Sequence, residues 1–130
     1  KNYIRMLLKK IIGVRDTISG RRYSDIIEIA KDQIRKTYMS DEISLNTIAA
    51  EVGMSPSYFS SIFSKEMGKT FVEYLTEIRM DRAKELLMCS SMKTSEIGYE
   101  VGYKDPHYFS YIFKKTQNCT PKEFRARGKE

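Results

Sequence analysis

The stretch of sequence that decides the fold occurs twice. The residues IAAEVG at 48–53 are followed by YFSSIF at 58–63, and the residues IGYEVG at 97–102 are followed by YFSYIF at 108–113. Each copy joins a short apolar segment to a second one through a turn that contains glycine, which is the outline of a helix-turn-helix unit. Because both parts recur in the same order and at nearly the same spacing, the sequence predicts two such units in tandem.

Capping residues ahead of apolar helical patterns predict where the helices begin. Ser24 is expected to cap a helix that ends near residue 39, and the capping box of Thr70 and Glu73 is expected to begin a long helix that reaches about residue 88. The remaining predicted starts are Ser44, Ser55 with Pro56, Thr94, Asp105 with Pro106, and Thr120 with Pro121. The expected fold is therefore all-α: two helix-turn-helix subdomains, each a homeodomain-like three-helix unit, joined by a long linker helix.

These elements divide the chain into four parts. We expect a basic connector at 1–23, a first helix-turn-helix subdomain at 24–69, a linker helix at 70–90 and a second subdomain at 91–130. The formal charge of the chain is +6, and the connector, with seven basic residues and one acidic residue, holds that whole excess. Net charge therefore does not show that the helical body binds a polyanion, and a case for nucleic acid has to rest on local faces.

Residues that would carry chemistry are sparse. Cys89 and Cys119 are too few for a disulfide framework and are expected to be reduced, buried thiols. His107 is the only histidine, and no cluster of Cys, His or carboxylate residues accompanies it, so we expect neither an enzyme nor a metal or other cofactor. No apolar run approaches the roughly 18 residues of a membrane span, and no signal peptide is visible. We expect a soluble, cytoplasmic protein that does not contact a membrane.

The second helix of each copy presents a free face that is suited to reading DNA. A helix advances about 100° per residue, so the Phe and Ile residues of each copy fall on one side and face the core. The opposite side carries Ser57, Ser60 and Ser61 in copy one, and His107, Ser110 and Tyr111 in copy two. We predict that these residues read base edges, with sharper readout in copy two, because serine hydroxyls discriminate weakly between bases. The alternative is that the serines only form a solvated helix face.

Candidate phosphate contacts lie further along these helices and on the linker. They are Ser64, Lys65, Arg79, Arg82, Lys114 and Lys115. Arg79 and Arg82 either bond phosphates or pair with acidic residues nearby on the linker helix. A linker of about 19 residues spans roughly 28 Å. With the widths of the helices added, that length is compatible with two successive major-groove segments, about 34 Å apart on one side of a duplex.

The quoted motifs resemble the DNA-binding region of the AraC/XylS family of bacterial transcription regulators. The resemblance covers about residues 24–127 and is carried by the residues at 45–65, 97–103, 108–115 and 120–125. It implies specific binding to double-stranded promoter DNA, contact with RNA polymerase in many members, and base reading by the six free-face residues named above. The serines of copy one depart from the longer polar side chains of many members, which agrees with weaker readout by that copy.

The connector adds a second resemblance. Its residues Ile4, Leu7, Ile11, Val14 and Ile18 follow the 3-4-3-4 spacing of a short coiled-coil seam. This stripe either forms a homodimer through residues 4–18 or packs on the domain itself. The segment is similar to connectors that join a receiver domain to an AraC-type output domain in two-component response regulators, so we expect such an output domain. The alternative function is a helical module that docks a protein such as RNA polymerase without specific DNA readout.

Overall fold

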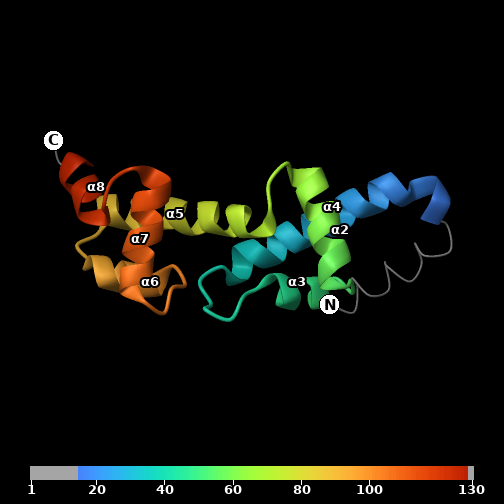
Figure 1. The fold of residues 1–130 in the computed structure, drawn as a ribbon, viewed down its shortest axis with the longest axis horizontal. Coiled ribbons are helices and arrows are strands. Elements are labelled where there is room, and N and C mark those ends of the chain that lie inside the picture. Colours follow the sequence, from blue (N-terminus) through green and yellow to red (C-terminus); the bar gives the residue numbers. More distant parts are fainter. Residues whose placement is uncertain (1–14, 129–130) are drawn as a thin grey trace.

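The computed structural model describes the backbone of residues 15–128 and the side chains from residue 23 onward. This part of the chain forms seven α-helices and no β-strand, which confirms the all-α prediction (Figure 1). The helices are α2 (Arg15–Thr37), α3 (Leu45–Glu51), α4 (Pro56–Met67), α5 (Phe71–Cys89), α6 (Thr94–Glu100), α7 (Pro106–Gln117) and α8 (Pro121–Gly128). The molecule is elongated, with α2, α3 and α4 at one end, α6, α7 and α8 at the other, and α5 running between the two ends (Figure 1).

Capping hydrogen bonds confirm most of the predicted helix starts. The Ser55 hydroxyl accepts a hydrogen bond from the backbone N–H of Tyr58 at the start of α4. In the capping box of α5, the Thr70 N–H donates to the Glu73 carboxylate at 2.8 Å, and the Glu73 N–H donates to the Thr70 hydroxyl at 3.1 Å. The predicted starts at Ser44, Asp105 and Thr120 are confirmed by bonds of the same kind. Local side-chain chemistry therefore sets where these helices begin.

One predicted helix start is wrong. Helix α2 begins at Arg15 and passes through Ser24, whose hydroxyl donates to the Glu66 carboxylate of α4 at 3.1 Å instead of capping a helix. A continuous helix already supplies carbonyl acceptors to the N–H groups near Ser24, so a cap has no role there. Helix α6 begins at Thr94 as predicted, and its N-cap is Lys93, whose backbone N–H donates to the Glu96 carboxylate at 3.0 Å.

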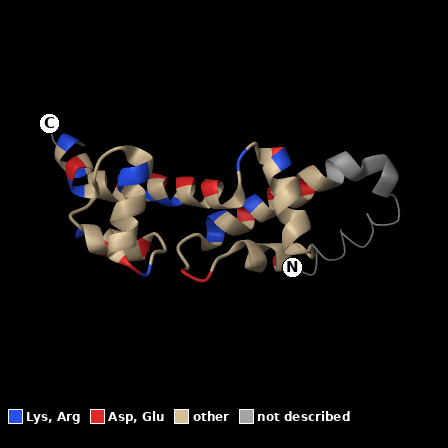
Figure 2. Ribbon diagram, in the orientation of Figure 1, with Lys and Arg blue, Asp and Glu red and all other residues tan. Residues whose placement is uncertain are grey.

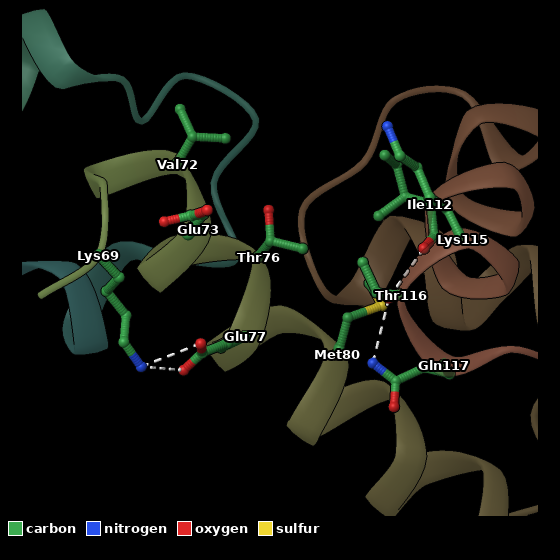
Figure 3. A pocket seen from close by; sticks show the side chains of 10 residues that line it. All are labelled: Lys69, Val72, Glu73, Thr76, Glu77, Met80, Ile112, Lys115, Thr116 and Gln117. Atoms are coloured by element: carbon green, nitrogen blue, oxygen red, sulfur yellow. Dashed lines mark hydrogen bonds and ion pairs between the residues drawn. The ribbon is translucent and has the colours of Figure 1, made fainter.

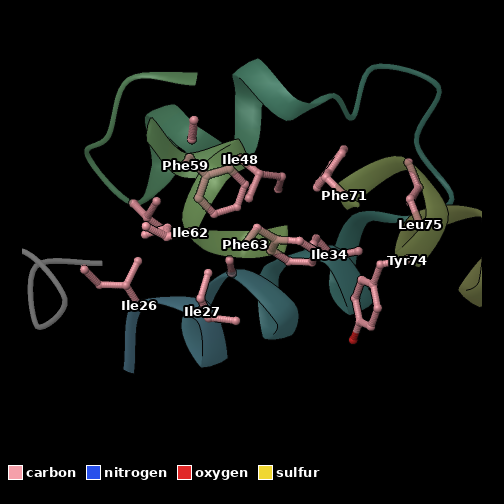
Figure 4. Close-up of a cluster of buried hydrophobic side chains, with 13 residues drawn as sticks. Ile26, Ile27, Ile34, Ile48, Phe59, Ile62, Phe63, Phe71, Tyr74 and Leu75 are labelled. Carbon is pink, nitrogen blue, oxygen red and sulfur yellow. The ribbon is translucent and has the colours of Figure 1, made fainter. Parts of the chain in front are cut away.

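The first hydrophobic core lies between α2, α3, α4 and the first turns of α5 (Figure 4). Helix α2 contributes one buried stripe, which consists of Ile26, Ile27, Ala30 and Ile34. Aromatic rings from α4 and α5 meet above this stripe, with the Phe63 centroid 6.0 Å from that of Phe71 and 5.7 Å from that of Tyr74. One side of α4 therefore packs into this core, and the opposite side of the helix faces solvent.

The second core repeats this arrangement with α6, α7, α8 and the later turns of α5. Phe113 packs between Phe109 and Phe124, with ring centroids 5.9 and 5.7 Å away. Cys119 is buried in this core as predicted, whereas Cys89 at the end of α5 is exposed, so the prediction of a buried thiol is wrong for Cys89. Both cysteines are free thiols.

Helix α5 belongs to both cores. Its residues Phe71, Tyr74 and Leu75 are buried in the first core, and Met80, Ala83 and Leu87 are buried in the second. Its 19 residues match the predicted length of the linker. Because both halves of α5 are packed, this helix joins the two helix-turn-helix units as a stiff strut. No helix within residues 15–128 is long and apolar enough to cross a membrane.

Candidate nucleic-acid interface

Helices α4 and α7 are equivalent in the two units. Each has 12 residues, begins with proline behind a side-chain cap, and ends at a residue in the left-handed conformation. That residue is Gly68 for α4, with φ of 73°, and Asn118 for α7, with φ of 65°. In the view of Figure 1 the two helices run in the same direction; α7 crosses α5 near one end, and α4 lies beyond the other end of α5, where it crosses α2. The structure therefore presents two similar helices, one from each unit.

The predicted base-reading residues lie on the free faces of these helices. Ser57, Ser61, His107 and Tyr111 are exposed, and Ser60 and Ser110 are half-buried at the flanks. The structure brings each set of three together on one helix, with the phenylalanine core directly behind it. Residues 57, 60 and 61 correspond to 107, 110 and 111, so hydroxyl groups in the first unit occupy the places of an imidazole, a hydroxyl and a phenol in the second.

The Tyr111 side chain contacts two neighbours on α7. Its ring centroid lies 6.2 Å from that of Tyr108, and the Lys115 ammonium lies over the ring, 5.8 Å from the centroid. Tyr111 is nevertheless 59% exposed, so most of its ring is free to meet a ligand. A partly supported aromatic ring loses less conformational freedom when it contacts a thymine methyl group than an unsupported one would.

Tyr108 is a candidate contact that sequence reasoning missed. Its side chain is 51% exposed, and its ring centroid lies 5.8 Å from that of the buried Tyr103. The signal was present in the sequence, because Tyr108 immediately precedes the buried Phe109 and the helical turn carries it to the edge of the free face. Its equivalent Tyr58 is also exposed, and the hydroxyl groups of Tyr58 and Tyr23 are hydrogen-bonded to each other.

Most of the predicted phosphate contacts are accessible. Lys65, Lys114 and Lys115 are exposed, and Ser64 and Arg82 are half-buried. Figure 2 shows basic residues at the C-terminal end of α7 and on the adjacent α8. Of the two alternatives for Arg82, the structure contains the acid pair, because its guanidinium bonds the Glu85 carboxylate on the same helix and this bond raises the pKa of Arg82. Exposed pairs of this kind are weak.

Arg79 does not fit the prediction of a phosphate contact. Its side chain is only 8% exposed, and its guanidinium donates to the backbone carbonyls of Tyr38 at 2.8 Å and Ser40 at 2.9 Å. The guanidinium carbon also lies 4.8 Å from the ring centroid of Tyr103. The guanidinium is therefore bonded to partners inside the molecule, and Arg79 is not accessible for a phosphate contact.

An open groove lies between α5 and α7, beside the free face of the second unit (Figure 3). It has a volume of about 700 Å³, and its lining includes Val72, Thr76 and Met80 of α5 and Ile112 of α7. The charged residue Lys69 at its edge is paired with Glu77 at 2.9 Å. Neither cysteine nor histidine lines this groove, and within residues 15–128 no group of three or more Cys, His, Asp or Glu residues is placed to hold a metal ion.

Comparison with known sequences finds relatives for most of the chain. The model of a family described as a helix-turn-helix domain matches residues 48–127. The chain is 36% identical over 100 residues to an uncharacterised HTH-type transcriptional regulator of Pseudoalteromonas carrageenovora, covering 77% of this chain and 58% of that protein. It is 34% identical over 127 residues to the arabinose operon regulatory protein of Escherichia coli, covering 94% of this chain and 41% of that protein. The chain thus spans about half the length of these curated relatives.

Solved structures extend the similarity to the arrangement of the two units. The C-terminal domain of AraT, a response regulator from Geobacillus stearothermophilus, superposes with a TM-score of 0.77 at 35% identity, covering 78% of this chain and 84% of that one. The C-terminal domain of the two-component response regulator YesN from Fusobacterium nucleatum gives a TM-score of 0.74 at 35% identity, covering 75% and 95%. The DNA-binding domain of AdpA, solved with a target DNA, shares the fold with a TM-score of 0.73 at 21% identity, covering 78% and 90%.

Proposed function

We propose, since this chain belongs to the AraC/XylS-type family of helix-turn-helix transcription regulators, that it binds double-stranded promoter DNA with sequence specificity and so regulates transcription. In this proposal α4 and α7 enter two successive segments of the major groove on one side of the duplex. The relatives that match the chain are transcriptional regulators rather than enzymes.

One observation carries the proposal. Two equivalent helices run in the same direction from one strut, and each turns an uncovered polar face away from its own core. The 19 residues of α5 span about 28 Å, and successive major-groove segments on one side of a duplex lie about 34 Å apart. With the widths of α4 and α7 added, the length of α5 is compatible with that separation, which a protein-docking module would not need.

The two units are proposed to contribute differently. Ser57, Ser60 and Ser61 allow the backbone of α4 to approach the bases closely with modest discrimination, and His107, Ser110 and Tyr111 give the sharper readout. Phosphate contact falls to Ser64 and Lys65 in the first unit and to Lys114 and Lys115 in the second. Because residue 64 is serine and its equivalent 114 is lysine, the second unit binds the phosphate backbone of the DNA more strongly. Arg82 joins these contacts only after its pair with Glu85 opens.

The proposal extends to the whole regulator. We assign residues 24–69 and 91–130 to the two DNA-binding subdomains, 70–90 to the linker and 1–23 to the connector of a response regulator whose output domain this is. Similarity to the C-terminal domains of AraT and YesN supports this assignment. Contact with RNA polymerase, and a homodimer formed through the connector, belong to the same proposal; residues 4–14 of that connector lie outside the described residues. The upstream sequence of the gene tests it: a receiver domain there supports the assignment, and a ligand-binding barrel contradicts it.

The test of DNA binding is a selection of bound sites from a random duplex pool, followed by fluorescence anisotropy titration of the selected duplex at several salt concentrations. We expect one enriched site with two half-sites about one helical turn apart, and an affinity that falls steeply as salt increases. Absence of any enriched sequence and of duplex binding at low salt contradicts the proposal. That outcome would favour the rival function of docking a protein such as RNA polymerase without DNA readout.

A further inference from the structure

The two helix-turn-helix units touch each other away from the linker helix, at a joint built from two turns. One turn follows α2 and includes Ser40 and Asp41, and the other follows α6 and includes Gly102 and Lys104. The Lys104 ammonium lies 3.9 Å from the Asp41 carboxylate across the joint. Arg79 of α5 lies between the two turns and contacts both.

Arg79 connects three parts of the structure: the linker helix that carries it, the first unit and the second unit. It donates to the carbonyls of Tyr38 and Ser40, in the turn that directly follows α2. Its guanidinium lies over the ring of Tyr103, which is buried in the core of unit two. The C-terminal end of a helix carries partial negative charge, so a buried cation is favourably placed there. A rigid planar fork that bonds two carbonyls also restricts rotation, which a single-point contact does not do.

Gly102 makes the joint close-packed. Its φ of +111° is one that side chains rarely adopt, and a Cβ atom at this position would lie 2.6 Å from the Tyr38 carbonyl oxygen and 2.8 Å from an Arg79 guanidinium nitrogen. The equivalent glycine of the first unit, Gly53, has nothing within 4 Å of such an atom. Hence the second turn needs glycine for an approach between units as well as for its own conformation.

We propose that Arg79 is a positioning residue that sets the orientation of one recognition helix relative to the other, and so sets the spacing of half-sites that the protein accepts. The effect on the spacing of half-sites rests on the proposed DNA binding, whereas the effect on the orientation of the two helices does not. The strut alone limits twisting about its axis only through the packing of each core against α5, which leaves some rotational freedom between the units. The bonds of Arg79 to both units remove that freedom, because a twist would separate the guanidinium from either the carbonyls or the ring.

The chain contains a matched control. Arg125 of α8 donates to the carbonyls of Leu87 at 2.9 Å and Ser90 at 3.2 Å, which end α5. It therefore makes the same pair of bonds at a helix end, but all of its partners are in the linker and the second unit. Arg125→Gln should weaken the attachment of α8 without loosening the joint, whereas Arg79→Gln should loosen the joint.

The first experiment needs no DNA. Spin labels are attached to Lys65→Cys and Lys115→Cys, on α4 and α7, in a Cys89→Ser background, and double electron–electron resonance gives the distribution of distances between them. We expect a narrow distribution for the parent protein and for Arg125→Gln, a broad one for Arg79→Gln, and an intermediate one for Arg79→Lys, which keeps the charge but not the fork. Parent-like widths in both Arg79 variants overturn the inference. If Arg79→Gln loses its helical circular dichroism, Arg79→Lys decides alone.

The second experiment uses the selected duplex and versions of it with one or two base pairs inserted between the half-sites. For the parent protein we expect each insertion to reduce affinity strongly. For Arg79→Lys we expect about a tenfold loss on the original duplex and a much smaller further loss on insertion, because a looser joint lowers the effective concentration of the second helix but tolerates more spacings. Equal spacing dependence in the two proteins overturns the inference. Failure of the parent protein to bind any duplex refutes the proposed function and leaves the resonance result standing.

Discussion

Alanine at Gly102 should destabilise the protein far more than alanine at the equivalent Gly53. Both glycines have positive φ, +73° at Gly53 and +111° at Gly102, so both substitutions strain the backbone. Strain of this kind costs about 1–2 kcal/mol, and the lower entropy of the unfolded chain returns about 0.4–1 kcal/mol. For Gly53→Ala, where nothing lies within 4 Å, the net cost should therefore be about 1 kcal/mol.

Gly102→Ala adds a steric cost that Gly53→Ala lacks. A carbon atom 2.6 Å from the Tyr38 carbonyl oxygen is well inside the distance of roughly 3.3 Å at which such atoms normally meet. The obstacle is backbone, which cannot swing aside as a flexible side chain does, so the two turns must move apart. Forcing atoms into a packed site typically costs about 1–3 kcal/mol, and that range is the expected excess of Gly102→Ala over Gly53→Ala.

The free energy of unfolding of both variants is measured by urea denaturation followed by circular dichroism, each in the parent and in an Arg79→Ala background. Removing the guanidinium takes away one of the two obstacles, so the excess cost of Gly102→Ala should shrink by about 1 kcal/mol in that background. The cost of Gly53→Ala should not change, because no contact links it to Arg79. Equal costs for the two glycine variants in the parent protein would refute the joint as a close-packed contact.

Three further predictions concern the interface and the core. His107→Ala should reduce discrimination between the selected duplex and a scrambled one by about 1–3 kcal/mol, and the matched Ser57→Ala should reduce it less; equal losses in anisotropy titrations contradict the division of roles. Removing Lys114 and Lys115 together should lower the slope of log affinity against log salt by about 2, and an unchanged slope excludes them as phosphate contacts. Burial raises the pKa of Tyr103 above its ordinary value of 10.0, so the folded protein keeps a proton that the unfolded chain releases, and stability falls as the pH rises above that value. Urea midpoints from about pH 8 to 11 should show this fall, and Tyr103→Phe should reduce it.

What the sequence predicts correctly depends on interactions between near neighbours in the chain. The capping pair of Thr70 and Glu73 is three residues apart, and the sequence alone locates the start of α5 from it. The free faces follow from the helical repeat, so exposed positions such as His107 and Tyr111 are correctly placed. The family follows from the same residues, because its motifs consist of caps, turn glycines and core aromatics.

What the sequence predicts wrongly depends on partners that are distant in the chain. Arg79 has acidic neighbours on its own helix, yet its hydrogen bonds go to carbonyls 41 and 39 residues away, which no local pattern reveals. Ser24 resembles a helix cap, but its hydroxyl bonds Glu66, 42 residues further along. In both cases tertiary packing brings a polar side chain to a partner that outcompetes the local one. Such contacts are also where the two units are joined, so the sequence shows the units more clearly than it shows their relative orientation.

The two copies differ on the faces that are proposed to read DNA. Positions that face the core are the same in both units, with Phe59 equivalent to Phe109 and Phe63 to Phe113, and all four are fully buried. Three outward positions differ, because residues 57, 61 and 64 are serine in the first unit and His, Tyr and Lys in the second; the outward Tyr58, Ser60 and Lys65 recur as Tyr108, Ser110 and Lys115. Three hydroxyls on one copy, and a ring nitrogen, a phenol and a cation on the other, offer different hydrogen-bonding groups to DNA. If the two faces read two half-sites, as proposed, those half-sites should differ in sequence, and the selected duplex should be asymmetric, with the half-site bound by α7 the better defined of the two.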